Sequence, residues 1–128
     1  MILLLDTHAA LWWWTRSRKL TPSVIAAITQ EENKIFFSTI SAYEINAKFK
    51  LGKLPEAEPF VHHLDALIAD SGFKVLELSL IHARAAGLLP GPHRDPFDRL
   101  LIAQAQTEKA HIVSADPVFA AYGAATVW

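Results

Sequence analysis

The sequence alternates short, uniformly apolar runs with longer stretches of helical periodicity. The clearest run is Ile2–Leu5, in which every residue is apolar and which ends at the acidic Asp6. A strand without a polar face is typical of a parallel sheet that helices cover on both sides. Because several such runs alternate with helical patterns, the sequence predicts an α/β fold built on a parallel sheet.

The same pattern gives the expected order of the elements. Strands are expected at Ile2–Leu5, Ile35–Ser38, Lys74–Leu78, Ile112–Ser114 and Ala125–Val127. Helices are expected at about Thr7–Trp14, Pro22–Gln30, Ser41–Lys50, Glu56–Ser71, Ile81–Leu88 and Pro96–Lys109, with a short one opening at Asp116–Pro117. The segment Pro90-Gly91-Pro92 separates the last two long helices.

Length and composition limit the classes of protein that this chain can be. A chain of 128 residues fits one domain with a real core, and we expect a single domain over residues 1–128. Hydrophobic residues make up 52% of the chain, which is high for a small monomer and suggests that a partner covers part of the apolar surface. The net charge of −1 does not indicate a nucleic-acid binder, although bound metal ions can supply positive charge at an acidic site.

The chain contains no cysteine, which excludes disulfides and any cysteine-based metal site or nucleophile. Its first residues lack the basic region of a signal peptide, and no stretch approaches the ~20 apolar residues of a membrane-spanning helix. We therefore expect a cytoplasmic protein that does not associate with a membrane.

Acidic residues recur near the starts of the predicted helices. The candidate site residues are Asp6, Glu44, Asp98 and Asp116. Taken singly, each has an ordinary explanation as a helix cap or a first-turn acid that suits the helix dipole. Glu44, for example, could complete a capping box with Ser41.

Together, the acids indicate a shared site. In a parallel sheet, the carboxyl ends of the strands and the starts of the following helices share one edge, where ligands bind at the point at which the strand order reverses. Ile102 and Ala105 lie on the same helical face as Asp98, so this face should turn towards the sheet.

Such a group of like charges needs a cation, and oxygen-only ligands favour Mg²⁺ or Mn²⁺. Metal ions held by carboxylates suit phosphodiester hydrolysis by an activated water. The sequence therefore predicts that Asp6, Glu44, Asp98 and Asp116 are metal ligands of a hydrolase.

Four segments, in this order along the chain, resemble the PIN-domain ribonucleases, and specifically the VapC-type toxins of bacterial toxin–antitoxin pairs. The matching segments are Leu3-Leu4-Leu5-Asp6-Thr7-His8, Ser41-Ala42-Tyr43-Glu44-Ile45, Asp95–Ala105 and Val113-Ser114-Ala115-Asp116-Pro117-Val118-Phe119. One departure is Ser114, which stands where a threonine is common.

The resemblance implies a three-layer α/β/α domain with a five-stranded parallel sheet. It implies that Asp6, Glu44, Asp98 and Asp116 bind one or two Mg²⁺ or Mn²⁺ ions, with Asp116 at the most variable position. It further implies an endoribonuclease that is the toxin of a type II pair, forms a homodimer and is silenced by a VapB-like antitoxin. The alternatives are a non-toxin PIN-like RNA-processing nuclease and a catalytically silent interaction module of the same fold.

Other charged residues near the predicted site have open roles. Asp95 could join the site, although a capping role is favoured, and Arg99 could bind RNA or balance nearby acids. The six histidines show no shared metal-ligand spacing and are interpreted as surface or structural residues, with His8 and His93 nearest to the site. Two basic clusters, which are either phosphate contacts or ordinary solvated surface, are Arg16, Arg18, Lys19 and Lys48, Lys50, Lys53.

Overall fold

The computed structural model describes residues 1–128 and contains a five-stranded sheet in the order β3-β2-β1-β4-β5, in which all pairings are parallel. The strands are β1 (Ile2–Leu5), β2 (Lys34–Ser38), β3 (Lys74–Leu76), β4 (His111–Val113) and β5 (Thr126–Val127). The helices are α1 (Thr7–Trp14), α2 (Pro22–Thr29), α3 (Thr39–Lys50), η1 (Pro55–Ala57, a 3-10 turn), α4 (Leu64–Asp70), α5 (Leu80–Leu88), α6 (Pro96–Glu108) and α7 (Pro117–Ala121). The predicted fold class is confirmed.

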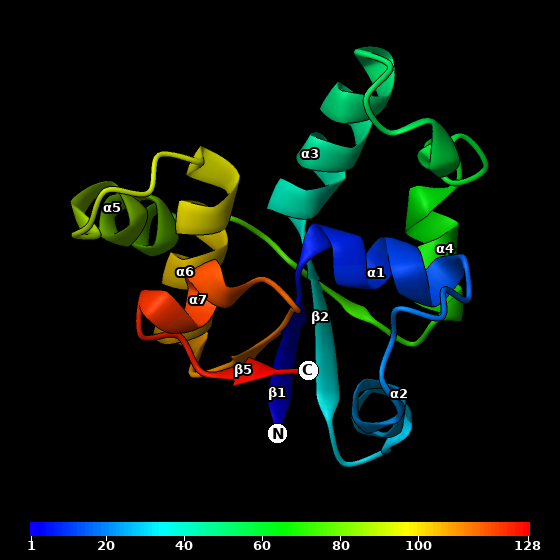
Figure 1. Cartoon of the computed structure of the whole chain (residues 1–128), viewed down its shortest axis with the longest axis horizontal. Helices are drawn as coiled ribbons and strands as arrows, with labels where there is room; N and C mark the ends of the chain where they lie inside the picture. The colour runs from blue at the N-terminus through cyan, green and yellow to red at the C-terminus, as the bar shows by residue number, and fades with distance from the viewer.

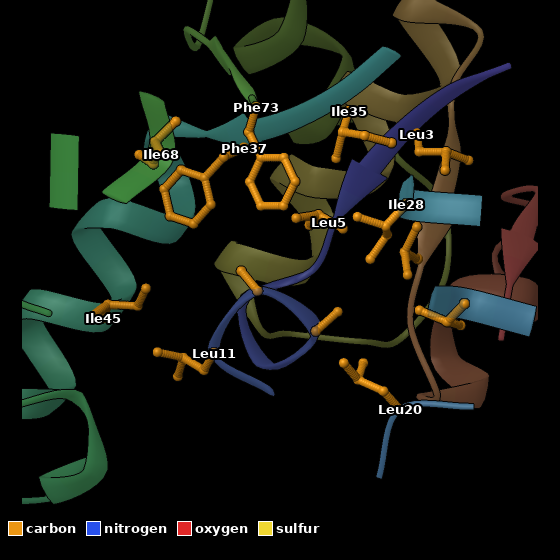
Figure 2. Close-up of a cluster of buried hydrophobic side chains, with 14 of the residues drawn as sticks. Leu3, Leu5, Leu11, Leu20, Ile28, Ile35, Phe37, Ile45, Ile68 and Phe73 are labelled. Atoms are coloured by element: carbon orange, nitrogen blue, oxygen red, sulfur yellow. The ribbon is translucent and has the colours of Figure 1, made fainter. Parts of the chain in front are cut away.

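Helices cover the two faces of the sheet (Figure 1). One buried cluster joins Leu3 and Leu5 of β1 to apolar residues of α1, α2, α3 and α4, and Figure 2 shows Phe37 and Phe73 packed within it. The other cluster joins Leu4 of β1 to α6 and α7. Successive residues of β1 thus enter opposite cores, which is why this strand has no polar position.

The strand order reverses at β1. The chain passes from β1 to β2 and β3 on one side, then crosses back to β4 and β5 on the other. The point of reversal lies between the carboxyl ends of β1 and β4, which pair with Leu5 opposite Val113. Side chains that follow these two strands are therefore placed at the crevice where α/β proteins bind ligands.

The predicted helix over Glu56–Ser71 is wrong. The structure has a 3-10 turn at Pro55–Ala57, then turns, and then α4 from Leu64. Pro59 explains the difference, because proline inside a helix removes one backbone hydrogen bond and clashes with the preceding turn. The other predicted helices and strands are present, with ends shifted by up to two residues. No helix has the length and apolar character needed to cross a membrane.

Candidate metal site

The four predicted acids line one cavity of about 410 Å³ at the carboxyl edge of the sheet. They come from separate parts of the fold: Asp6 follows β1, Glu44 lies in α3, Asp98 lies in the first turn of α6 and Asp116 follows β4. The cavity therefore occupies the point of strand reversal.

Asp6 is held in place by the two strands that flank the reversal point. It is the N-cap of α1, where its Oδ1 accepts a hydrogen bond from the Ala9 backbone N–H at 2.8 Å. Its Oδ2 accepts a hydrogen bond from the Ser114 hydroxyl, which follows β4. Burial raises the pKa of Asp6 above the ordinary 3.8, against the opposing effect of these hydrogen bonds. The carboxylate is thus fixed in a position where ionisation is costly without a cation.

Glu44 is buried and does not complete the predicted capping box. The N-cap of α3 is Ser38, whose hydroxyl accepts from the Ile40 N–H, so Ser41 lies inside the helix. The hydroxyl of Thr7 donates to Glu44 Oε1 at 2.6 Å. Because the helix starts earlier than predicted, Glu44 lies beyond its first turn, and its side chain lines the cavity.

Lys48 lies one turn after Glu44 and supplies a positive charge to the cavity. Its ammonium donates to Glu44 Oε2 and forms an ion pair with that carboxylate. Burial alone would lower the pKa of Lys48, but the hydrogen bond to Glu44 and the charges of Glu44, Asp95 and Asp98 together raise it. One residue of the predicted basic clusters therefore lies in the site.

Asp98 lies in the first turn of α6, next to a histidine. His93 Nε2 is 2.9 Å from Asp98 Oδ2. Burial raises the pKa of Asp98 above 3.8, and the charges of Asp95 and Glu44 add to the rise, whereas the hydrogen bond with His93 opposes it. Asp95 has the favoured capping role, because its Oδ1 accepts from the Phe97 N–H at 2.9 Å, and it also lines the cavity.

Asp116 is the most exposed of the four acids. Its Oδ1 accepts from the Val118 N–H at 2.9 Å and caps α7, while its own N–H donates to Ser114 Oγ at 3.0 Å. Ser114 therefore connects Asp116 to Asp6. This shared hydroxyl keeps the two acids that follow β1 and β4 on the same side of the cavity.

The donor set fits a hard divalent cation. The four predicted acids offer carboxylate oxygens, burial raises the pKa of two of these acids, Asp6 and Asp98, and no cysteine competes. The acids line the cavity walls without forming a closed cage; the group whose ligand atoms all lie within 4.8 Å of one another is His93, Asp95 and Asp98. Mg²⁺, which keeps several water ligands, suits such an open arrangement.

The sequence interpretation placed His8 and His93 nearest to the site; His8 lines the cavity, and His93 pairs with Asp98. It missed one contribution, which is a tryptophan. Trp12 also lines the cavity and packs edge-on against Trp128 at 5.5 Å between ring centroids. Arg99 has a structural role, because its guanidinium donates to the backbone carbonyls of Ala86, Leu89 and His93.

The buried charge of Asp6 predicts that Asp6→Asn stabilises the metal-free protein. Because its pKa is raised, Asp6 keeps its proton to a higher pH in the folded state than in the unfolded state. The free energy of unfolding therefore falls as the pH rises from 3.8 through the pKa of Asp6 in the folded protein. At pH 7 the asparagine removes this cost and keeps an oxygen that caps α1. We expect a higher midpoint of thermal unfolding than the parent in chelator, with the difference shrinking towards pH 4.

Added Mg²⁺ should reverse that order. A ligand that binds only the folded state at 100 times its Kd stabilises the protein by about 2.7 kcal/mol, and the variant should lose most of this gain. Asp70→Asn, an equal charge change on an exposed residue of α4, serves as the control. If Asp6→Asn unfolds at a lower temperature than the parent at pH 7 without metal, then the buried charge of Asp6 does not destabilise the fold and this interpretation is wrong.

The fold and the cavity define a parallel α/β protein with a carboxylate-lined cavity at the strand reversal. The chain belongs to the PIN domain family, whose model matches residues 3–125. Members of this family are typically nucleases and generally use a divalent metal. The predicted PIN membership is thereby confirmed.

Solved structures show the same fold over nearly the whole chain. VapBC2 from Rickettsia felis, bound to a DNA fragment from its promoter, is 18% identical with a TM-score of 0.69, covering 99% of this chain and 98% of that one. FitAcB from Neisseria gonorrhoeae is 17% identical with a TM-score of 0.69, covering 98% and 96%. FitAB bound to the IR36 DNA fragment is 16% identical with a TM-score of 0.62, covering 98% and 93%. No curated protein sequence matches the chain.

Proposed function

We propose that this protein is a Mg²⁺-dependent endoribonuclease and the toxin of a type II toxin–antitoxin pair. The observation that carries the proposal is the convergence of acids from four parts of the fold on one cavity, in a chain of the PIN family. Asp6, Glu44, Asp98 and Asp116 would hold Mg²⁺ or Mn²⁺ there. When bound, the metal supplies an activated water and stabilises the leaving oxygen of the phosphodiester.

The chain's own residues prepare the site for that chemistry. Thr7 and Ser114 donate hydroxyl hydrogen bonds that orient Glu44 and Asp6, which fixes the oxygens that face the cavity. Lys48 lies where its ammonium can contact a phosphate of the RNA once Glu44 binds metal. These contacts support positioning of the substrate without reading its sequence.

The toxin assignment is supported by the resemblance of the four sequence segments to VapC-type toxins and by the shared fold with VapBC2 and FitAcB. We therefore propose a VapB-like antitoxin as the cognate partner. The alternatives are a PIN-like RNA-processing nuclease without an antitoxin, and a silent interaction module. The presence of every predicted acid in the cavity favours a nuclease over the silent module.

Two experiments separate these functions. The purified protein, incubated with RNA, should cleave it with Mg²⁺ or Mn²⁺ and stop when a chelator is added; a folded, metal-bound protein that leaves RNA intact would support the silent module. Induced expression in a bacterium should arrest growth, and co-expression of the small open reading frame next to its gene should restore it. RNA cleavage without growth arrest would favour the RNA-processing nuclease.

Helix α5 carries the surface that we propose for a homodimer. Leu80, Ile81 and Leu88 are 73%, 64% and 84% exposed, although they are large and apolar. Ile81 and Leu88 are seven residues apart and therefore lie on one face of the helix. An apolar face of this kind is typical of a surface that a second copy covers.

We expect the protein to have twice the mass of one chain by light scattering at micromolar concentration. Leu88→Glu should shift it to a monomer, because it places a charge in the apolar contact. Ile25→Glu, on a 43% exposed apolar residue of α2, is the matched control and should leave the dimer intact. A monomeric parent protein would contradict the homodimer.

A further inference from the structure

Tryptophans occupy three consecutive positions at the end of α1, and of these three only Trp12 lines the acidic cavity. Trp13 packs against Phe73, with 6.3 Å between the ring centroids. Trp14 also contacts Phe73, and its indole Nε1 donates to Ser71 Oγ at 2.9 Å. Trp12 is half-buried: part of it packs against the same core, and the rest faces the carboxylates. Core packing therefore explains two of the rings and leaves the cavity side of Trp12 unexplained.

The position of Trp12 relative to Asp6 suits a nucleotide bound at the acidic cavity. Asp6 caps α1, and Trp12 comes six residues later, which is about 9 Å along the helix axis. His8 lies between them, lines the same cavity and has its ring centroid 5.9 Å from that of Trp12. The separation of Asp6 and Trp12 is of the size of one nucleotide, from its phosphate to its base. A strand whose phosphate lies near Asp6 can therefore place a base at Trp12.

Two neighbours prepare the Trp12 ring for such a ligand. Trp128, which follows β5, packs edge-on against Trp12 with 5.5 Å between centroids and restricts the orientation of the ring. The Lys19 ammonium lies over the Trp12 ring, 5.1 Å from its centroid. Because the Lys19 side chain is exposed and flexible, a base can take its place over the ring while the ammonium contacts a phosphate. An aromatic face beside a positive charge is the combination with which proteins bind single-stranded RNA.

We propose that Trp12 is a stacking platform for one base of the RNA, and that Lys19 contacts a phosphate beside that base. The proposal rests on the proposed nuclease function for the identity of the ligand, and it adds how the chain holds the strand. Such contacts are needed because the net charge of the chain is −1 and the carboxylates of the cavity repel phosphates. Since every base has a π-face, the platform positions the strand without reading its sequence.

A comparison of RNA with a ribose-phosphate chain that lacks the bases tests the stacking. Both ligands are short, single-stranded and of equal length. Fluorescence anisotropy measures their affinities for the whole protein in Ca²⁺, which carboxylates bind, and a gel shows that the RNA stays intact. Trp12→Leu should weaken binding of the RNA about tenfold or more and change binding of the base-free chain much less. Trp12→Phe, which keeps an aromatic face, should retain most of the affinity for RNA.

Lys19→Gln tests the phosphate contact. For a single strand, each lost contact of this kind reduces the slope of log affinity against log salt by about 0.7, so the variant should show this change with both ligands. Lys34→Gln is the matched control, because the Lys34 ammonium also lies over an aromatic ring, that of Phe36. Lys34 begins β2 and therefore lies at the opposite edge of the sheet, where its loss should leave the slope unchanged. An unchanged slope in Lys19→Gln overturns the phosphate contact.

The outcomes separate this proposal from the proposed function. Circular dichroism and the unfolding temperature show that each variant is folded. If Trp12→Leu weakens binding of both ligands equally, or of neither, the stacking role is overturned, even in a protein that cleaves RNA. A preference for RNA that depends on Trp12, in a protein that cuts no RNA with Mg²⁺ or Mn²⁺, would leave the platform standing and refute the nuclease function. A parent protein that binds neither ligand overturns both.

Discussion

Replacing Asp98 by asparagine is expected to reduce Mg²⁺-dependent RNA cleavage about a thousandfold or more. Metal ions contribute several kcal/mol of transition-state stabilisation to phosphodiester hydrolysis, and each 1.36 kcal/mol corresponds to a factor of ten in rate. Asp98 is partly buried at the start of α6 and faces the cavity with Glu44 and Asp6. Asparagine keeps the shape of the side chain but loses the charge that would hold the metal. The rate of cleavage of a labelled RNA measures the loss.

The controls separate a lost metal ligand from a lost fold. Asp98→Asn and the parallel variant Asp6→Asn should keep the circular dichroism spectrum of the parent, and Asp70→Asn should keep its activity. Asp116→Asn should have a smaller effect, because Asp116 is the most exposed of the four acids. If the folded Asp6→Asn and Asp98→Asn variants both cleave as fast as the parent, the assignment of the site is wrong.

Replacing Gln104 by methionine is expected to destabilise the fold by about 2–3 kcal/mol. Gln104 of α6 is fully buried, and its Oε1 accepts a hydrogen bond from the Ser38 hydroxyl at 2.6 Å. Methionine fills a similar volume but leaves that hydroxyl without an acceptor, at a cost of about 1–3 kcal/mol in addition to the lost bond. In a chain of this length, the midpoint of thermal unfolding should fall by roughly 10 °C.

A glutamine on the same helix that makes no buried hydrogen bond serves as the control. Gln106 of α6 is exposed, and its only side-chain hydrogen bond is one of 3.4 Å to the Tyr122 carbonyl. Gln106→Met should therefore change the unfolding temperature by much less than Gln104→Met. Equal effects of the two substitutions would show that the Ser38–Gln104 bond contributes nothing specific.

Residue patterns determine much of this fold because local and global signals agree. The uniformly apolar Ile2–Leu5 run predicted a strand buried on both faces, and the structure places its residues in two separate cores. Ile102 and Ala105 were expected to turn towards the sheet and are buried there. Since a parallel sheet brings the strand ends to one edge, the placement of the four acids around one cavity followed from the element order.

The remaining features depend on tertiary contacts that periodicity does not encode. Ser38 and Ser41 are both good helix caps, and only the end of β2 decides that the helix starts after Ser38. The pairing of His93 with Asp98 depends on the path of a loop, which Gly91, Tyr122 and Arg99 fix through contacts far apart in the sequence. Gln104 shows no sign in the sequence that distinguishes it from the exposed Gln106.

The Ser38–Gln104 hydrogen bond also determines how far the cavity can relax. Ser38 caps α3, the helix that carries Glu44. Gln104 lies in α6, the helix whose first turn contains Asp98. The bond therefore fastens together the two helices whose acids repel each other across the cavity. Because this bond opposes separation of the two helices, the acids stay close to one another without a cation. A cation bound there would meet ligands that need little reorganisation.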